Sequence, residues 1–225
     1  MRLEMSEVNA LPSYLVFGST GVLGSAVAEK LAAEGLVIKA PRELDRLDKA
    51  CDQISYFNGV IWAQGLNGES DAFTYQEEIL DQMLQANLKY VLKSLKMLLE
   101  KELISSGSNL LVVSSIWGNK ARPNKLNYSI SKAALAAAVR SFAVDLGPIG
   151  ISINAIAPGP VDSRMTRKML SKKLVDRVVS ETPLKRLVNP SEVAEVALSL
   201  LAGRMPGVTG QEIAIDGGWG ISKLV

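Results

Sequence analysis

The fold of this 225-residue chain is decided by the stretch Tyr14-Leu-Val-Phe17-Gly18-Ser19-Thr20-Gly21-Val22-Leu23-Gly24. Its four leading apolar residues predict a buried strand, because a short apolar run bounded by a turn residue is typical of the inside of a sheet. A helix should follow from Leu23 to Glu34 and end at Gly35, which we expect to be its C-cap. A strand, a glycine-rich turn and a helix in this order favour a parallel sheet covered by helices.

The rest of the chain continues this alternation of short apolar runs and longer amphipathic stretches. Strands are predicted over residues 36–40, 59–63, 110–114, 151–156 and 211–215, and helices over residues 75–104, 128–146 and 190–201. The sequence shows no linker or repeat, so we expect one domain over residues 1–225.

Composition and charge exclude several classes of function. Apolar residues make up 48% of the chain and charged residues 21%, which is ordinary for a globular protein. The net charge of +2 is too small to indicate a nucleic-acid partner. With no histidine and a single cysteine, Cys51, we expect no metal site and no internal disulfide. The first residues lack the apolar core of a secretory signal and no apolar run is long enough to span a membrane, so we expect a cytoplasmic protein.

The glycine-rich turn stands between a predicted strand and a predicted helix, where such turns hold phosphate groups. Glycine lets the backbone approach a pyrophosphate closely, and the helix N-terminus offers free amides and a positive dipole end. We therefore expect a dinucleotide to be bound by Gly18, Ser19, Thr20, Gly21, Val22, Leu23 and Gly24. The alternative is a tight strand–helix turn that binds nothing.

The residues after the second predicted strand indicate which dinucleotide is preferred. An acidic residue there would bond the ribose 2′-hydroxyl of NADH, whereas the 2′-phosphate of NADPH suits arginine. The chain has Lys39-Ala-Pro-Arg42 with no acid before Glu43, so we expect NADPH to be favoured over NADH, with Arg42 at the phosphate. Alternatively, Lys39 and Arg42 are solvated, and Glu43 or Asp45 meets the ribose.

Three further residues predict chemistry at a carbonyl group. Tyr128 and Lys132 are spaced i and i+4, so they share one face of the predicted helix. Free tyrosine has a pKa of about 10, and a nearby ammonium lowers the pKa of the phenol toward the range where proton transfer is efficient. Ser115 follows the preceding predicted strand and would hydrogen-bond the substrate oxygen, while its neighbour Ser114 is expected to cap backbone groups.

With these landmarks in this order, the chain resembles the short-chain dehydrogenase/reductase family over nearly its whole length. Further landmarks are Asn87, Asn154-Ala-Ile-Ala-Pro158-Gly159-Pro-Val161 and Ile215-Asp216-Gly-Gly-Trp. The resemblance implies a doubly wound Rossmann-like α/β fold, with a strand and a helix abbreviated within residues 41–58. It also implies a catalytic set in which Tyr128 protonates the carbonyl oxygen, Lys132 lowers the pKa of Tyr128 and holds the nicotinamide ribose, Ser115 orients the carbonyl, and Asn87 supports a water chain to Lys132.

Two segments depart from the classical pattern of this family. The glycine spacing is that of atypical members, with Val22 where the classical pattern has glycine. Trp62-Ala63-Gln64-Gly65 replaces Asn-Asn-Ala-Gly, so we expect Trp62 to pack in the core while Ala63, Gln64 and Gly65 still pass the adenosine. The nicotinamide carboxamide should meet Pro158, Gly159 and Val161, with Ser163 in place of the usual threonine.

Residues 164–182 are expected to form a lid over the substrate. Six basic residues lie between positions 164 and 177, against one acid, Asp176. The lid would attract an anionic substrate such as a carrier-bound acyl chain, a CoA thioester or a sugar nucleotide; a solvated lysine-rich helix face is the alternative. The segment Pro183-Leu-Lys-Arg186 and the C-terminal end resemble beta-ketoacyl carrier-protein reductases, in which dimers or tetramers form through the long helices.

Two functions therefore remain open. The first is an NAD(P)-dependent oxidoreductase that reduces a ketone or oxidises the corresponding alcohol. The second is a dinucleotide-sensing protein with little turnover, which would explain Val22 and the altered segment Trp62 to Gly65. The intact Ser115, Tyr128 and Lys132 favour the first, because a sensor has little need of all three.

Overall fold

The computed structural model describes residues 11–52 and 54–222. The first residues, which lack the apolar core of a secretory signal, lie outside the described residues. Within this part of the chain one parallel sheet of six strands has the order β2-β1-β3-β4-β5-β6. The strands are β1 (Ser13–Phe17), β2 (Leu36–Lys39), β3 (Gly59–Trp62), β4 (Asn109–Val113), β5 (Ser152–Pro158) and β6 (Glu212–Ile215). The strand order reverses beside β1, so the predicted doubly wound Rossmann-like fold is confirmed, and its crevice lies past the ends of β1 and β3.

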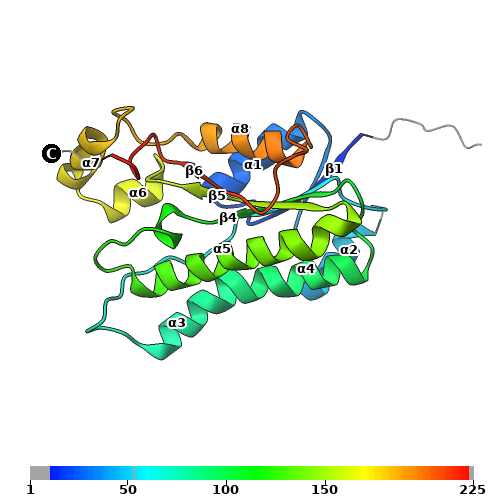
Figure 1. Cartoon of the computed structure of the whole chain (residues 1–225), viewed down its shortest axis with the longest axis horizontal. Helices are drawn as coiled ribbons and strands as arrows, with labels where there is room; N and C mark the ends of the chain where they lie inside the picture. The colour runs from blue at the N-terminus through cyan, green and yellow to red at the C-terminus, as the bar shows by residue number, and fades with distance from the viewer. Residues whose placement is uncertain (1–10, 53, 223–225) are drawn as a thin grey trace, which may run out of the picture.

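Helices cover both faces of the sheet, as Figure 1 shows. One face carries α1 (Val22–Ala32) and α8 (Pro190–Leu201), which pack against each other. The other carries α4 (Tyr90–Glu100) and α5 (Leu126–Leu146), with α3 (Glu77–Leu84) leading into α4. None of the helices within residues 11–52 and 54–222 has the length and apolar character needed to cross a membrane.

The core lies on both sides of the sheet because β1, β3 and most of β4 and β5 are buried on both faces. Tyr14 and Val16 pack under α1 and α8, whereas Leu15 and Phe17 pack toward α4 and α5. This double burial explains why the strands read as continuous apolar runs and not as alternating ones.

The long helix predicted over residues 75–104 is interrupted. A π-helical segment, Gln85–Lys89, separates α3 from α4, and α4 ends at Glu100. Such π segments are rare and occur frequently at functional sites. Here the segment carries Asn87.

The abbreviated segment and the predicted C-cap of α1 have different outcomes. Between β2 and β3 the described residues hold only a 3₁₀ turn (Leu44–Arg46) and the five-residue α2 (Leu47–Cys51), as expected. The prediction for Gly35 was wrong, because Ala33 caps α1 in a right-handed conformation. Gly35 is needed for another reason: a Cβ there would lie 2.0 Å from the carbonyl oxygen of Pro12.

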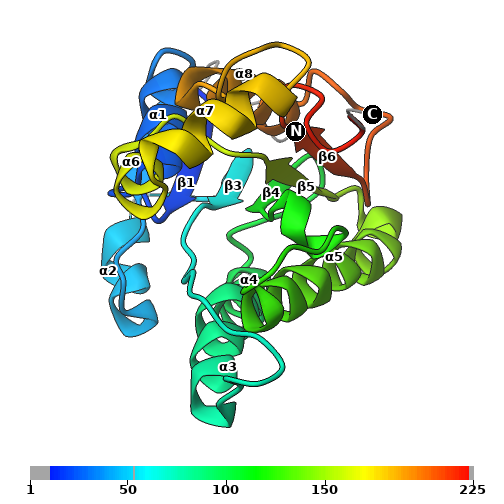
Figure 2. The same cartoon turned by 90° about the vertical axis from the view of Figure 1, so that its left-hand side faces the viewer.

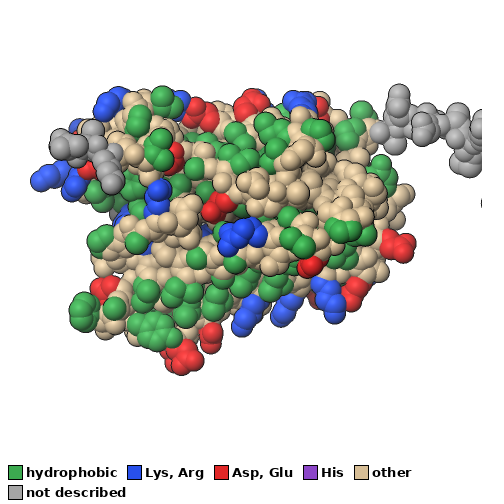
Figure 3. Space-filling view, in the orientation of Figure 1, with side chains coloured by type: hydrophobic (Ala, Val, Ile, Leu, Met, Phe, Trp, Pro, Cys, Tyr) green, Lys and Arg blue, Asp and Glu red, His purple; other side chains and the backbone are tan. Residues whose placement is uncertain are grey.

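The expected lid consists of two short helices, α6 (Arg164–Met169) and α7 (Lys172–Glu181). Its two stems are paired, since Asp162 N donates to the carbonyl of Val188 at 2.8 Å and Val188 N to that of Pro160 at 3.1 Å. Figure 1 and Figure 2 show α6 and α7 at one end of the molecule, past the start of α8. In Figure 3, Lys and Arg side chains gather at this end of the molecule.

Candidate active site

The glycine-rich turn is pressed between β3 and α1. Gly18 has a φ of +74°, and Gly21 N closes the turn by donating to the Gly18 carbonyl at 3.0 Å. A Cβ on Gly18 would lie 2.4 Å from the backbone nitrogen of Gln64, and one on Gly24 would lie 2.1 Å from the Gly18 carbonyl oxygen. Both positions therefore exclude any side chain, which brings the start of α1 against the end of β3.

The turn fits the pyrophosphate of a dinucleotide. Helix α1 begins without a side-chain cap and without an acidic residue in its first turn, so its amides and dipole remain available to an anion. Both polar atoms of the Gln64 side chain are buried and have no hydrogen-bond partner in the described residues, which a bound nucleotide at this crevice would remedy. The Val22 side chain is 43% exposed, so it occupies no space inside the turn.

The segment after β2 presents Arg42 to solvent. The Tyr90 hydroxyl donates to the backbone carbonyls of Pro41 and Arg42, at 3.4 and 3.2 Å, which fixes this corner. The Arg42 side chain is exposed and makes no ion pair with a described residue, whereas Glu43 lies 3.9 Å from Arg46. Arg42 is therefore free to meet a 2′-phosphate.

The altered segment after β3 is built into the core. Trp62 is buried and stacked on Phe17 with ring centres 5.5 Å apart, and its indole nitrogen donates to the Ser94 hydroxyl at 2.7 Å. This confirms Trp62 as a packing residue. Ala63 N donates to the Phe17 carbonyl at 3.0 Å, which joins the ends of β1 and β3.

Ser115 lies two residues past the end of β4 and is buried. Its hydroxyl accepts a hydrogen bond from Trp117 N at 3.3 Å and so caps a short 3₁₀ turn, Ile116–Gly118. Ser114 was expected to cap backbone groups, but its buried hydroxyl has no partner in the described residues. Ser115 makes the cap instead.

Tyr128 and Lys132 lie on the first turns of α5, as predicted. Lys132 is 3% exposed, its ammonium donates to the Val113 carbonyl at 2.7 Å, and it lies 5.8 Å from the centre of the Tyr128 ring. Burial lowers the pKa of Lys132 to about 8, although the Glu212 carboxylate acts in the opposite direction. Burial also raises the pKa of Tyr128, and the hydrogen bond with Ser115 offsets only part of that rise. In the protein alone, burial outweighs the lowering that we expected from Lys132.

The burial of Lys132 predicts how the free energy of unfolding depends on pH. Below about pH 8 the folded protein holds a charged amine in its core; between about pH 8 and 10.5 the unfolded chain binds more protons at this residue, so its contribution to stability rises with pH. We expect Lys132→Met to be more stable than the parent by about 1–3 kcal/mol at pH 7, with the advantage vanishing by about pH 10.5. Urea unfolding of both proteins at several pH values measures this; an advantage that stays constant with pH would contradict it.

Asn87 ties the π segment to α5 and to the loop after β3. Its side-chain oxygen accepts from Leu66 N at 2.6 Å, and its nitrogen donates to the Leu66 carbonyl and to the Ser131 hydroxyl, both at 2.9 Å. A Cβ on Gly65 would lie 3.1 Å from this oxygen and 3.5 Å from the Lys132 ammonium. Asn87 therefore lies near Lys132, and its amide fixes the backbone of Leu66.

The loop after β5 runs along the turn that follows β6. Gly159 N donates to the Ile215 carbonyl at 2.9 Å, and a Cβ on Gly159 would lie 2.6 Å from that of Asp216. Pro158 ends β5 and Val161 forms an isolated bridge with Val188, so this loop leads directly into α6, the first helix of the expected lid. The Ser163 hydroxyl accepts from Thr166 N at 3.1 Å and caps α6.

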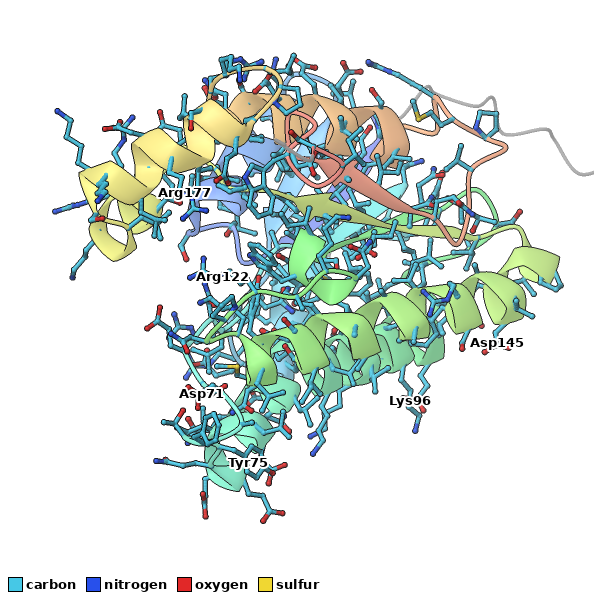
Figure 4. All side chains as sticks on the ribbon, turned by 60° about the vertical axis from the view of Figure 1, so that its left-hand side comes forward. Asp71, Tyr75, Lys96, Arg122, Asp145 and Arg177 are labelled. Atoms are coloured by element: carbon cyan, nitrogen blue, oxygen red, sulfur yellow. The ribbon has the colours of Figure 1, made fainter. Side chains whose placement is uncertain are left out.

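A cavity of about 280 Å³ lies between the Ser115 loop, α7 and the C-terminal turn. It is lined by Trp117, Lys120, Glu181 and Trp219, and its two indole rings meet edge to face at 5.3 Å. Figure 4 shows Arg177, on α7, and Arg122, on the loop before α5, at this end of the molecule. Sequence reasoning missed this pocket. Trp219 ends the landmark Ile215-Asp216-Gly-Gly-Trp, but only the fold brings it together with Trp117, Lys120 and Glu181.

Known proteins resemble this chain in sequence and structure. A family model described as Enoyl-(Acyl carrier protein) reductase matches residues 18–220. A 3-oxoacyl-[acyl-carrier-protein] reductase of Thermotoga maritima is 34% identical over 172 residues, which cover 76% of this chain and 70% of that protein. A Mycobacterium tuberculosis protein of the same description is 26% identical and covers 93% of each chain.

Solved structures agree with this placement. A short-chain dehydrogenase family protein from Francisella tularensis superposes with a TM-score of 0.84 at 25% identity, covering 95% of this chain and 100% of that one. An aldohexose dehydrogenase from Thermoplasma acidophilum shares the fold with a TM-score of 0.88 at 19% identity, covering 96% of each chain. From its matched residues and its fold, this chain belongs to the short-chain dehydrogenase/reductase family of oxidoreductases.

Proposed function

We propose that the protein reduces a ketone to a secondary alcohol with NADPH. The observation that carries the proposal is the convergence of Ser115, Tyr128 and Lys132 past the end of β4, on the sheet edge that also holds the uncapped glycine turn. When bound, the dihydronicotinamide supplies the hydride that reaches the carbonyl carbon. The residues of the chain supply position, a proton and electrostatics.

The role of each side chain follows from its surroundings. Tyr128 gives its phenolic proton to the carbonyl oxygen and is left as a phenolate. Its raised pKa keeps the phenol protonated before the reaction but works against the transfer, so a cation that favours the phenolate is needed beside it. The Ser115 hydroxyl polarises the carbonyl oxygen. The Lys132 ammonium favours the phenolate and holds the ribose, and the Asn87 amide supports the backbone beside Lys132.

The lid and the relatives favour an acyl thioester or another anionic carbonyl compound as substrate. Two lid cations are paired, Arg167 with Asp162 and Arg177 with Glu181. The other four, Arg164, Lys168, Lys172 and Lys173, make no ion pair within the described residues. Two relatives are named 3-oxoacyl-[acyl-carrier-protein] reductase, and this name describes an enzyme that acts on such thioesters.

Calorimetric titration with NADPH and with NADH, followed by turnover of acetoacetyl-CoA and of small ketones, tests the function. We expect NADPH to bind more tightly and the thioester to be reduced. Binding of neither dinucleotide would show that the altered turn is not a cofactor site. Binding without turnover of any carbonyl compound would favour the dinucleotide sensor.

Arg42 provides a sharper test of the preferred dinucleotide. Because its guanidinium is exposed and unpaired in the described residues, Arg42→Ala should weaken NADPH binding by about tenfold, the usual worth of one charged hydrogen bond, and leave NADH binding within about twofold. Arg140→Ala, an exposed arginine on α5, is the control and should change neither affinity. An equal loss for both dinucleotides would remove the 2′-phosphate role from Arg42.

A further inference from the structure

Two buried ammonium groups lie beside the same tyrosine. Among the described residues, the buried charged side chains are Lys125, at 4% exposed, and Lys132, at 3%. Each ammonium nitrogen is 5.8 Å from the centre of the Tyr128 ring. Burying an amine without a carboxylate partner is costly, so two such groups around one side chain indicate a requirement at that side chain.

The loop after β3 fixes the start of α5, where Tyr128 lies. Lys125 is the N-cap residue of α5 but its side chain makes no cap. The buried Ser70 does so instead, since its backbone carbonyl accepts from Leu126 N and its hydroxyl from Asn127 N, both at 3.0 Å. In Figure 4, Asp71 of this loop and Arg122 of the loop before α5 lie at the same end of the molecule.

The Lys125 side chain is held by this same loop. Its ammonium donates to the side-chain oxygen of Asn67 and to the carbonyl of Gly68, both at 3.0 Å. The charged groups around it are Arg122, which repels it, and Glu69, which attracts it, and burial is the main cause of the lowered pKa of Lys125. No described carboxylate lies within ion-pair distance, so the positive charge is left to act on the Tyr128 ring.

We propose that Lys125 is a positioning residue for Tyr128: held by Asn67 and Gly68, its ammonium steadies the ring and favours the phenolate that forms when Tyr128 gives up its proton. This inference rests on the proposed reduction. Tyr128 is then served by two cations, Lys132 from within α5 and Lys125 from its N-terminus. The loop after β3 holds both Lys125 and the first turn of α5 in place.

Steady-state kinetics at pH 7 provide the first test. Lys125→Met should lower kcat about tenfold, with KM and the Kd for NADPH within about twofold of the parent, since a charge near 6 Å contributes of the order of one to two factors of ten. Lys125→Arg should recover most of kcat, and Lys125→Gln, which keeps a donor for the loop, should not. Ser70→Ala removes one hydrogen bond at the start of α5 but leaves the Lys125 ammonium in place, so it should lower Tm and lower kcat less than Lys125→Met does. Equal losses of kcat in Ser70→Ala and Lys125→Met, or no recovery by Lys125→Arg, would overturn the proposal.

A second readout needs no turnover. Tyrosine labelled with ¹³C at Cζ gives five signals, and the signal of Tyr128 is the one missing in Tyr128→Phe. Between pH 7 and 10.5 this signal should sense the deprotonation of both Lys125 and Lys132 in the parent. The control Lys96→Met, which changes an exposed lysine on α4, should behave in the same way, whereas Lys125→Met should show only the deprotonation of Lys132. An identical titration in Lys125→Met would overturn the proposal. If the parent reduces no carbonyl compound, the proposed function fails, and this titration still decides whether Lys125 acts on Tyr128.

Discussion

Tyr128→Phe is expected to lower the rate of carbonyl reduction by roughly a thousandfold, within the range lost when a general acid is removed. The change deletes one oxygen from a half-buried ring, so its effect on stability should be small, and the Kd for NADPH should stay within about threefold. Turnover under saturating NADPH, calorimetric Kd and Tm measured together separate loss of chemistry from loss of fold.

The control for this change is Tyr75→Phe, which removes the same atom from a tyrosine that is 47% exposed, outside the catalytic group. It should leave kcat and Tm unchanged. If Tyr128→Phe turned over substrate at the parent rate, Tyr128 would not be the acid. If neither the parent nor the variant reduced any carbonyl compound while NADPH still bound, the sensor would be the better interpretation.

Gly24→Ala is expected to destabilise the protein and to weaken dinucleotide binding at the glycine turn. Its Cβ would lie 2.1 Å from the backbone oxygen of Gly18, which no rotamer change can relieve. Overpacking of this kind costs about 2–3 kcal/mol, which lowers Tm by roughly 5–10 °C in a protein of this size. Displacing the Gly18 carbonyl also opens the turn, so NADPH binding should fall at least about tenfold.

Gly21→Ala is the matched change for stability. Its Cβ would meet only the Gly18 carbonyl oxygen, at an ordinary distance of 3.4 Å, and its φ is negative. We expect a Tm close to that of the parent. Equal Tm values for Gly24→Ala and Gly21→Ala would show that the close approach of α1 to the turn does not constrain the fold.

The sequence located the elements well where burial alone decides them. Helix α8 begins at Pro190 and ends at Leu201 as predicted, and its N-cap is Asn189, the residue immediately before it. It located them less well where a distant partner decides. The π segment at Asn87 follows from hydrogen bonds to Leu66 and Ser131, residues 21 and 44 positions away, which no local periodicity encodes. Assembly as a dimer or tetramer through α4 and α5 stays a prediction.

By itself the sequence predicted the order of strands and helices, the glycine turn and the shared helix face of Tyr128 and Lys132, because periodicity and spacing record which residues must be buried or share a helix face. The family resemblance added Ser115 and Asn87 to this group. Only the tertiary structure decided what surrounds that group. Ser70 caps α5 from 57 residues away, Lys125 is buried beside Tyr128, and burial sets the pKa of both Lys132 and Tyr128. The physical reason is that desolvation and hydrogen-bond partners depend on how distant segments pack, which the local pattern does not contain.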